Sequence, residues 1–362
     1  MKILFVSHSS VLKYHQQKLE ILASKYGHDI TLVTPPSWPE GGTNIKAYTG
    51  GKIKYKTGMT IMIRSRMLHF YLDAIEIMRN VQPDIIHIEE EPFSPACWQF
   101  VSAAKRDGKK VIFFTWENIK RKHNPVYTYF DKYCIANANA AIAGNAEGKA
   151  ILKEKGFKEN IEVIPQYGVN LEDFPARDIA PSKNEYNIAY IGRLAPEKGI
   201  ETIFSALKGT RGFKLHITGS GPSLEKLKNE AVAAEIADRT EFHPNMDREK
   251  IPEFLSKMDI LILPSITTAI WKEQFGRVLI EAMAAKVPVI GSNSGEIQNV
   301  IDGAGLVFEE GTPVALASAI ISLVSDEKLY MECVNKGYER VKANYTNEVI
   351  AGKLNEFYKN IK

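Results

Sequence analysis

Two carboxylates, Glu273 and Glu281, have the spacing in this chain that is best suited to chemistry. They bracket a short apolar segment that starts with Phe275 and Gly276, and helix-forming residues follow. This pattern predicts that Glu273 lies just before a helix and Glu281 on it. At about 1.5 Å of rise per residue, roughly 12 Å would separate them, close to the distance between the sugar and the ribose of a nucleotide sugar. The free N–H groups of the helix start would favour an anion between them, such as a diphosphate.

Four further sequence blocks surround this pair and make it specific. They are Tyr190–Gly199, Ile217–Pro222, Asp259–Ser265 and Val287–Ser292. In order and spacing, the blocks and the Glu-x7-Glu pair resemble the signature of the retaining glycosyltransferases of family 4. The resemblance covers the second half of the chain strongly and the first half loosely. It implies the α/β fold called GT-B, in which two Rossmann-like, doubly wound domains face each other across a cleft.

The resemblance places a nucleotide-sugar donor in the second half of the chain. Arg193 and Lys198 would hold the donor diphosphate, and this suits their charge, because the leaving nucleoside diphosphate gains negative charge as the glycosidic bond breaks. Glu273 would bond the sugar hydroxyls and Glu281 the two ribose hydroxyls. Arg277 could reach a phosphate or form a structural ion pair, and the alternative for Arg193 and Lys198 is a surface pair near Glu197. The expected donor-binding residues are Gly192, Arg193, Lys198, Gly219, Asn245, Met246, Glu273, Phe275, Gly276, Arg277 and Glu281.

The acceptor is expected in the first half, beginning with the loop after the first strand. Many relatives carry a glycine pair in that loop, whereas this chain has His8, Ser9 and Ser10. These three are acceptor-side candidates, although His8 could also be a solvated loop residue. The acidic run Glu89–Glu91 ends another strand, and it either contacts a ligand or forms an exposed turn.

Glu117 is a further acceptor-side candidate and, with Glu273, Arg193 and Lys198, completes the set of expected catalytic residues. It ends a strand at the position where many family members have a histidine. A carboxylate there could accept the proton of the acceptor hydroxyl. The alternative is an ion pair with Lys120 or Arg121.

The implied reaction moves a sugar from a nucleotide sugar to an acceptor hydroxyl with retention of anomeric configuration, as a hexosyltransferase does. The chain contains no Asp-x-Asp motif, so no metal is expected to bridge the diphosphate and transfer is expected to be metal-independent. No cofactor is expected besides the donor substrate, a UDP- or GDP-sugar. The acceptor would be a small molecule, a glycan or a lipid-linked molecule. The alternative is a non-hydrolysing sugar-nucleotide epimerase of the same architecture. A Rossmann dehydrogenase is disfavoured, because no Gly-x-Gly-x-x-Gly follows the first strand.

The elements that would position these residues alternate between strand-like and helix-like segments. Residues 2–7, 12–26 and 29–34 form an opening strand, helix and strand, whose ligand crevice should lie at the carboxyl ends of the strands. A length of 362 residues favours two domains. A segment rich in charge, alanine and proline near residue 180 predicts an acceptor-binding domain over 1–180 and a nucleotide-sugar-binding domain over 181–362. The final helix, about 347–362, is expected to pack back on the first domain.

Composition is ordinary for a globular protein, with a net charge of +3. Basic residues are in excess in the first half, notably over 40–66, where they form either a solvated hairpin or a face for an anionic acceptor or a membrane surface. Nothing indicates nucleic acid. No apolar run reaches the roughly 20 residues that span a bilayer, so a cytoplasmic protein is expected, with peripheral contact at the inner face of the membrane as an alternative. The three cysteines are far apart, which predicts buried free thiols.

Overall fold

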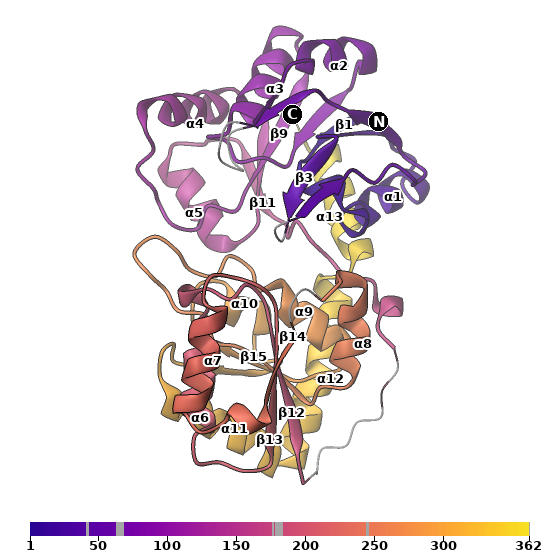
Figure 1. The fold of residues 1–362 in the computed structure, drawn as a ribbon. Helices are drawn as coiled ribbons and strands as arrows, with labels where there is room; N and C mark the ends of the chain where they lie inside the picture. Colours follow the sequence, from indigo (N-terminus) through magenta and orange to yellow (C-terminus); the bar gives the residue numbers. More distant parts are fainter. Residues whose placement is uncertain (41–42, 63–68, 176, 178–183, 244–245, 362) are drawn as a thin grey trace. The chain divides into compact units, whose positions relative to one another are not determined.

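The computed structural model describes residues 1–40, 43–62, 69–175, 177, 184–243 and 246–361. The chain divides into two compact units, one formed by Met1–Tyr167 with Asn347–Lys362 and the other by Gly168–Thr346 (Figure 1). The first unit therefore ends earlier than the boundary expected near residue 180. The physical reason is a backbone pairing inside the second unit, where Val169 N–H donates to the Tyr345 carbonyl at 3.0 Å and Val169 bridges Thr346.

The first unit contains a seven-stranded parallel sheet with the order β11-β10-β9-β8-β1-β2-β5. Its strands are β1 (Lys2–Val6), β2 (Asp29–Thr34), β5 (Lys54–Thr57), β8 (Ile85–Ile88), β9 (Lys110–Thr115), β10 (Ala140–Ala143) and β11 (Asn160–Val163). Alternate residues of β1 enter different cores: Leu4 and Val6 pack on one face of the sheet, Ile3 and Phe5 on the other. The sheet is thus buried on both faces, which explains the continuous apolar run of its first strand.

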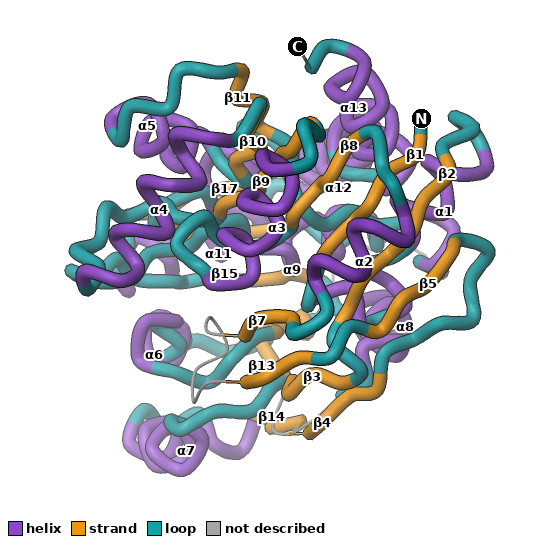
Figure 2. Tube along the Cα trace, turned by 90° about the horizontal axis from the view of Figure 1, so that it is seen from above, coloured by secondary structure: helices purple, strands orange, loops and turns teal. Residues whose placement is uncertain are grey.

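Helices cover both faces of this sheet. One core contains residues of α2 (Ala74–Val81), α3 (Pro95–Arg106) and α4 (Pro125–Asn137), and the other contains residues of α1 (Gln17–Ser24) and α13 (Asn347–Lys359). Figure 1 shows α13 in yellow among the indigo elements of the first unit, against α1. Figure 2 shows β1, β2 and β8 side by side.

The starts of three helices in the first unit follow from local sequence. The side chains of Ser94, Asn124 and Asn145 accept hydrogen bonds from the first turns of α3, α4 and α5 (Ala146–Glu154). Proline occupies the first position of α3 and of α4, where no backbone N–H is needed.

The second unit contains a six-stranded parallel sheet with the order β14-β13-β12-β15-β16-β17. Its strands are β12 (Tyr186–Ile191), β13 (Phe213–Thr218), β14 (Thr240–His243), β15 (Ile260–Leu263), β16 (Val289–Ser292) and β17 (Leu306–Phe308). Its helices are α6 (Glu201–Leu207), α7 (Leu224–Ala233), α8 (Ile251–Ser256), α9 (Arg277–Ala284), α10 (Ile297–Ile301), α11 (Pro313–Ser325) and α12 (Glu327–Asn344). The strand order reverses between β12 and β15, as it does between β1 and β8 in the first unit. In such sheets, ligands bind beyond the carboxyl ends of the strands at the reversal point.

Two antiparallel hairpins lie outside the large sheets: β3 (Ser37–Glu40) with β4 (Thr43–Lys46), and β6 (Thr60–Met62) with β7 (His69–Tyr71). Short 3-10 turns are η1 (Ser9–Val11), η2 (Lys13–His15), η3 (Leu171–Asp173), η4 (Pro196–Lys198), η5 (Ala237–Arg239) and η6 (Arg248–Lys250). All three cysteines are buried and free, as expected. Among the described residues, no helix combines the length and apolar character needed to cross a membrane.

Candidate functional site

Three loops of the second unit meet at the point where its strand order reverses. The loop after β12 contacts the loop after β15 through Ile266 N–H, which donates to the Glu197 carbonyl at 2.9 Å. The loop after β13 packs directly on the loop after β12, because Gly219 has a φ of 149° and a Cβ on it would lie 1.9 Å from the Gly192 carbonyl oxygen. Gly219, one of the expected donor-binding residues, therefore permits close packing of these two loop backbones.

Lys198 and Glu273 are brought together there. The Lys198 ammonium lies 2.7 Å from Glu273 Oε2 and 4.4 Å from the ring centroid of Trp271. Ser265 Oγ donates to the same carboxylate oxygen at 2.8 Å. Because Lys198 and Glu273 are both mostly buried, a cation and an acceptor of hydrogen bonds are presented at fixed positions. Such a pair suits a ligand that carries both a phosphate and hydroxyl groups.

Arg193 is held differently. Its side chain is 66% exposed, and its Nη1 lies 4.0 Å from Glu197 Oε1. The expected surface pair with Glu197 therefore exists but is long, and such exposed pairs contribute little energy. Arg193 can exchange this contact for an anion at low cost.

The Glu-x7-Glu segment folds as its pattern indicates. Glu273 precedes α9 and Glu281 lies on it, while Gly276 caps the helix with a φ of 77°, a left-handed conformation that favours glycine. Phe275 is buried against the ring of Tyr345. The start of α9 is thus fixed in place a few residues after Glu273.

Glu281 is held by two arginines. Its Oε1 lies 3.0 Å from Arg277 Nε and accepts a hydrogen bond from Arg248 Nη2 at 2.5 Å. Of the two interpretations of Arg277, the ion pair is therefore present. Asn245 lies outside the described residues, and Met246 follows it in the loop before η6.

The first unit has a cavity of about 160 Å³ where its own strand order reverses. It is lined by His8, Glu89, Glu90, Glu91, Ser94, Phe114, Trp116, Gln166 and Tyr167. The lining comes from the ends of β1, β8 and β9 and from residues that follow β11. Carboxylates and aromatic rings dominate it.

The loop after β1 is fixed by hydrogen bonds rather than solvated. His8 Nδ1 lies 2.7 Å from Glu90 Oε2, and the backbone N–H of His8 donates to Glu90 Oε1 at 2.8 Å. His8 is therefore a partly exposed loop residue whose ring and backbone are held by Glu90. Ser9 Oγ accepts from Gln166 Nε2 at 3.2 Å, whereas Ser10 is fully buried and its Oγ donates to Ser7 Oγ at 3.1 Å. Only His8 of the three lines the cavity.

Glu89, Glu90 and Glu91 have separate partners, so the exposed-turn interpretation of this run is wrong. Glu89 forms a buried ion pair with Lys18. Burial lowers the pKa of Lys18, although the negative charge of Glu89 opposes this shift. Burial alone would raise the pKa of Glu90, but His8 and His69 hold it well below its ordinary value.

Glu91 has the opposite shift. Burial raises the pKa of Glu91 to about 7, although Thr115 Oγ1 and Trp116 N–H donate to its carboxylate at 2.6 and 2.8 Å. Three adjacent carboxyl groups thus have three different electrostatic environments.

The structure corrects the expected partners of Glu117. Its carboxylate forms an ion pair with Lys155, and its Oε1 lies 3.5 Å from His123 Nε2. Lys120 instead contacts Glu154. Lys155 Nζ also lies 2.9 Å from Asp131 Oδ2, so one lysine joins two buried carboxylates. Glu117 is not among the residues that line the cavity, and its catalytic role stays a prediction.

Several residues that contact these sites were not recognised as site residues from the sequence. Trp271 and Arg248 contact Lys198 and Glu281, while Lys18, His69 and Gln166 contact the acidic run after β8. Their positions along the chain are remote from their partners, and a single sequence gives no signal that joins them. Only the proximity of Trp271 to Glu273 could have indicated one of these contacts.

Comparison with known families decides what this chain is. The model described as "Glycosyltransferase Family 4" matches residues 22–173, and "Glycosyl transferases group 1" matches residues 172–340. The chain belongs to the group 1 glycosyltransferases of family 4. Both models describe glycosyltransferases, which gives the epimerase alternative no support.

Relatives and solved structures agree with this assignment. The GDP-mannose-dependent α-(1-6)-phosphatidylinositol monomannoside mannosyltransferase of Mycobacterium tuberculosis is 31% identical over 47% of this chain and 46% of its own length. A capsular polysaccharide biosynthesis glycosyltransferase of Staphylococcus aureus is 30% identical over 63% of this chain and 58% of its own. The chain thus spans about half the length of the curated relatives it matches.

Among solved structures, Anabaena HepE in complex with UDP superposes with a TM-score of 0.76 at 16% identity, covering 99% of this chain and all (100%) of that one. At this identity the likeness shows the fold alone. Two Rossmann-like α/β units of the GT-B type are therefore established for this family member.

Proposed function

We propose that this family member transfers a hexose from a nucleotide-sugar donor to an acceptor hydroxyl with retention of anomeric configuration. The observation that carries the proposal is the pairing of Lys198 with Glu273 at the reversal point of the second sheet, where their side-chain atoms lie 2.7 Å apart. A donor diphosphate would take the ammonium as its partner, and the Glu273 carboxylate would then accept hydrogen bonds from the sugar hydroxyls. In the free protein the two groups neutralise each other.

The leaving group would be stabilised by fixed charges. Ser265 donates a hydrogen bond to Glu273, the ion-pair partner of Lys198, and the Lys198 ammonium lies over the Trp271 ring. Arg193 is exposed on the same loop as Lys198. The developing charge on the diphosphate would meet these cations and the N–H groups at the start of α9. The donor phosphate oxygen would help to deprotonate the acceptor on the same face of the sugar. No metal is needed for this stabilisation.

The cavity of the first unit fits a hydroxyl-rich acceptor group. Carboxylates accept hydrogen bonds from hydroxyls, and the Trp116 and Tyr167 rings, stacked with centroids 6.2 Å apart, offer flat apolar surface to a sugar ring. An acidic lining disfavours a phosphate at this position. A small molecule, a glycan or the glycan portion of a lipid-linked acceptor would satisfy these conditions.

Nucleotide binding tests the proposal without knowledge of the acceptor. We expect UDP or GDP and one of their sugars to raise the melting temperature, because a ligand that binds only the folded state stabilises it. A thermal-shift panel of UDP, GDP, ADP and their common sugars measures this, with and without EDTA. The shift should be the same with EDTA, since Lys198 and Arg193 supply the charge. Absence of a shift with every nucleotide would contradict the proposal.

Glu281→Gln identifies the nucleotide-binding unit in the same assay. We expect it to weaken nucleotide affinity about tenfold or more, because a hydrogen bond to a charged group contributes about 1.5–3 kcal/mol. Glu253→Gln is the control, as Glu253 pairs only with Lys257 among the described residues, on the exposed surface of α8. Equal affinities of both variants would place the ribose elsewhere.

Retention itself is read from the anomeric coupling constant of the product by NMR.

Contact with a membrane surface is the expected way for the first unit to reach a lipid-linked acceptor. Exposed basic residues of the 40–66 stretch include Lys46, Lys52 and Lys56, and Arg64 and Arg66 lie outside the described residues. Exposed apolar side chains occur nearby at Met59 and Leu72, whose backbones are joined by a hydrogen bond of 2.8 Å. Basic and apolar side chains together favour an anionic bilayer.

Co-sedimentation with phosphatidylglycerol vesicles measures this contact. We expect binding that falls with added salt and that is reduced several-fold in the double variant Met59→Ser, Leu72→Ser. Val232→Ser, an equally exposed apolar residue of α7, is the control. Binding that is unaffected by the double variant and by salt would remove the first unit as the membrane contact.

A further inference from the structure

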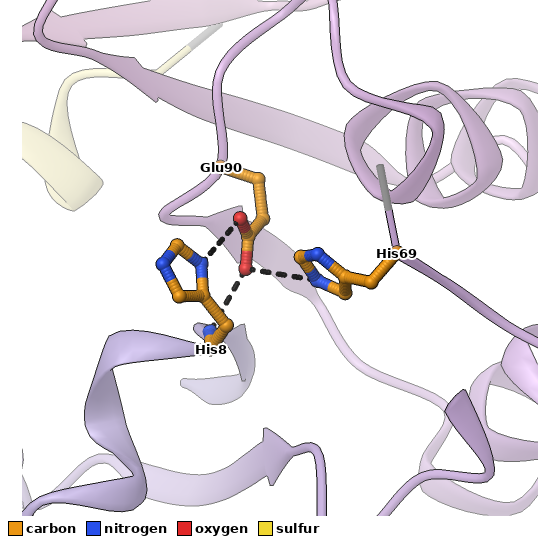
Figure 3. A group of neighbouring side chains, drawn as sticks. All are labelled: His8, His69 and Glu90. Carbon is orange, nitrogen blue, oxygen red and sulfur yellow. Dashed lines mark hydrogen bonds and ion pairs between the residues drawn. The ribbon is translucent and has the colours of Figure 1, made fainter. Parts of the chain in front are cut away.

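A second cluster of chemical groups in the first unit is not explained by donor binding. His8 comes from the loop after β1, His69 from β7 and Glu90 from the loop after β8, and all three side chains point at one another (Figure 3). His8 Nδ1 lies 2.7 Å from Glu90 Oε2, and His69 Nε2 lies 3.4 Å from Glu90 Oε1. One ligand atom from each residue lies within 4.8 Å of the other two.

His69 has unsatisfied bonding capacity. Its side chain is fully buried, and neither ring nitrogen makes a hydrogen bond with any described residue. Its polar contact within the described part of the chain is the 3.4 Å approach to Glu90. Buried ring nitrogens are nearly always bonded, and an exception points to an ion or water at that place. Of the two ring nitrogens, Nε2 faces Glu90, so a ligand bound to Nε2 would lie on the side of Glu90 and His8.

Among the described residues, aromatic rings lie on one side of the cluster and the cavity of the first unit lies on another. The Trp38 ring lies 4.4 Å from the His8 ring and 4.8 Å from the His69 ring, and the Tyr71 ring lies 5.6 Å from His69, measured between centroids. These aromatic rings cover part of the cluster. His8 is 29% exposed and, with Glu90, lines the cavity of the first unit. An exchangeable ligand would therefore enter from the cavity.

We propose that His8, His69 and Glu90 bind one divalent first-row transition metal ion, with Zn²⁺ as the best match. Two imidazole nitrogens and one carboxylate oxygen form a known set of three protein ligands for zinc, with a fourth position left for water or substrate. At metal–ligand distances near 2.1 Å, two ligands of a tetrahedral ion lie about 3.4 Å apart. His69 Nε2 already lies at this distance, 3.4 Å, from Glu90 Oε1. His8 Nδ1 lies 2.7 Å from the other oxygen, Oε2, so the His8 ring or the carboxylate would shift for both nitrogens and one oxygen to reach the ion.

The ion would act on the acceptor side. It would neutralise part of the acidic lining and leave its fourth position towards the cavity, where a water or an acceptor hydroxyl could coordinate and become more acidic. This consequence rests on the proposed function, whereas metal binding itself does not. The donor diphosphate still depends on Lys198 and Arg193 rather than on a metal.

A comparable group in the second unit provides a control. His216, Glu241 and His243 also bring their ligand atoms within 4.8 Å of one another. Glu241 is 45% exposed and forms an ion pair with Lys214, and His216 Nε2 lies 3.1 Å from Asn187 Oδ1. These groups already have partners, so we expect them not to retain the ion.

Zinc titration of the chelator-treated full chain tests the proposal. Calorimetry should give one equivalent of Zn²⁺, and Co²⁺ should give the visible absorption bands of a tetrahedral nitrogen and oxygen site. We expect His69→Asn and Glu90→Gln each to weaken Zn²⁺ binding by more than about 100-fold. This exceeds the loss of affinity that follows when a residue that only hydrogen-bonds a metal ligand is replaced. His243→Asn should leave the affinity unchanged.

Circular dichroism and the nucleotide-induced thermal shift show whether each variant is folded. A wild-type chain that binds no Zn²⁺ would overturn the proposal. So would binding that survives in folded His69→Asn and Glu90→Gln or is lost in His243→Asn. If Zn²⁺ binds as expected but no nucleotide does, the metal site stands and the proposed transferase function fails.

Discussion

Lys198→Ala is expected to slow cleavage of the donor's glycosidic bond about a hundredfold. Removing one fixed cation that faces a developing anion raises the free energy of the transition state by on the order of 3 kcal/mol. Lys198 is the better placed of the two expected cations, because it is mostly buried and is held by Glu273 and the Trp271 ring. Arg193→Ala should show a smaller loss, since its side chain is 66% exposed.

Release of nucleoside diphosphate under single-turnover conditions measures this effect, with water as acceptor if no other is known. The donor is the nucleotide sugar that the thermal-shift panel identifies. Lys208→Ala is the control. Lys208 follows the last residue of α6, is exposed, and its side chain makes only a long contact of 4.0 Å with Glu235 among the described residues. If Lys198→Ala releases diphosphate as fast as the Lys208→Ala control, Lys198 does not stabilise the leaving group.

Lys155→Met is expected to lower the free energy of unfolding by about 3–5 kcal/mol. Lys155 joins the buried carboxylates of Glu117 and Asp131, and its removal leaves two like charges without a cation. Lys155 is itself shifted: burial would lower its pKa, but Asp131 and Glu117 together raise it. Burial raises the pKa of Asp131, although Lys155 opposes this shift.

Urea unfolding measures this change, and Lys153→Met, an exposed position in the last turn of α5 just before Lys155, is the matched control. Glu117→Gln distinguishes the two roles of Glu117. A structural role gives reduced stability with an unchanged transfer rate per folded molecule. An acid-base role gives a transfer rate reduced about a hundredfold at unchanged nucleotide affinity. A Lys155→Met chain as stable as Lys153→Met would show that the ion pair contributes little.

Local pattern was sufficient for the Glu273–Glu281 segment of the second unit. Glu273 before a helix and Glu281 on it were predictable, because helix-forming residues and a capping glycine are close together in the sequence and the spacing fixes their geometry. The apolar run of β1 likewise predicted a strand buried on both faces. The pairing of Lys198 with Glu273 could not be predicted from local pattern, because it depends on the strand order that places β12 beside β15.

The limits of the sequence are clearest at Glu117 and at the three-residue cluster of His8, His69 and Glu90. Lys120 and Arg121 were the expected partners of Glu117 because they are near in sequence, yet the buried cation that reaches it comes from the end of α5. His69 gave no signal at all, since it lies in a short hairpin strand far along the chain from His8.

The sequence by itself indicated the family, the α/β fold and the sequence motifs of the second unit, because these depend on short-range spacing and on strand and helix periodicity. Only the tertiary structure decided which charges meet. Parallel strands pair across long connections, so the loops at their carboxyl ends become neighbours regardless of their distance along the chain. Burial makes an unpaired charge costly, and this is why each glutamate of the acidic run after β8 has its own partners in one cavity instead of forming an exposed turn.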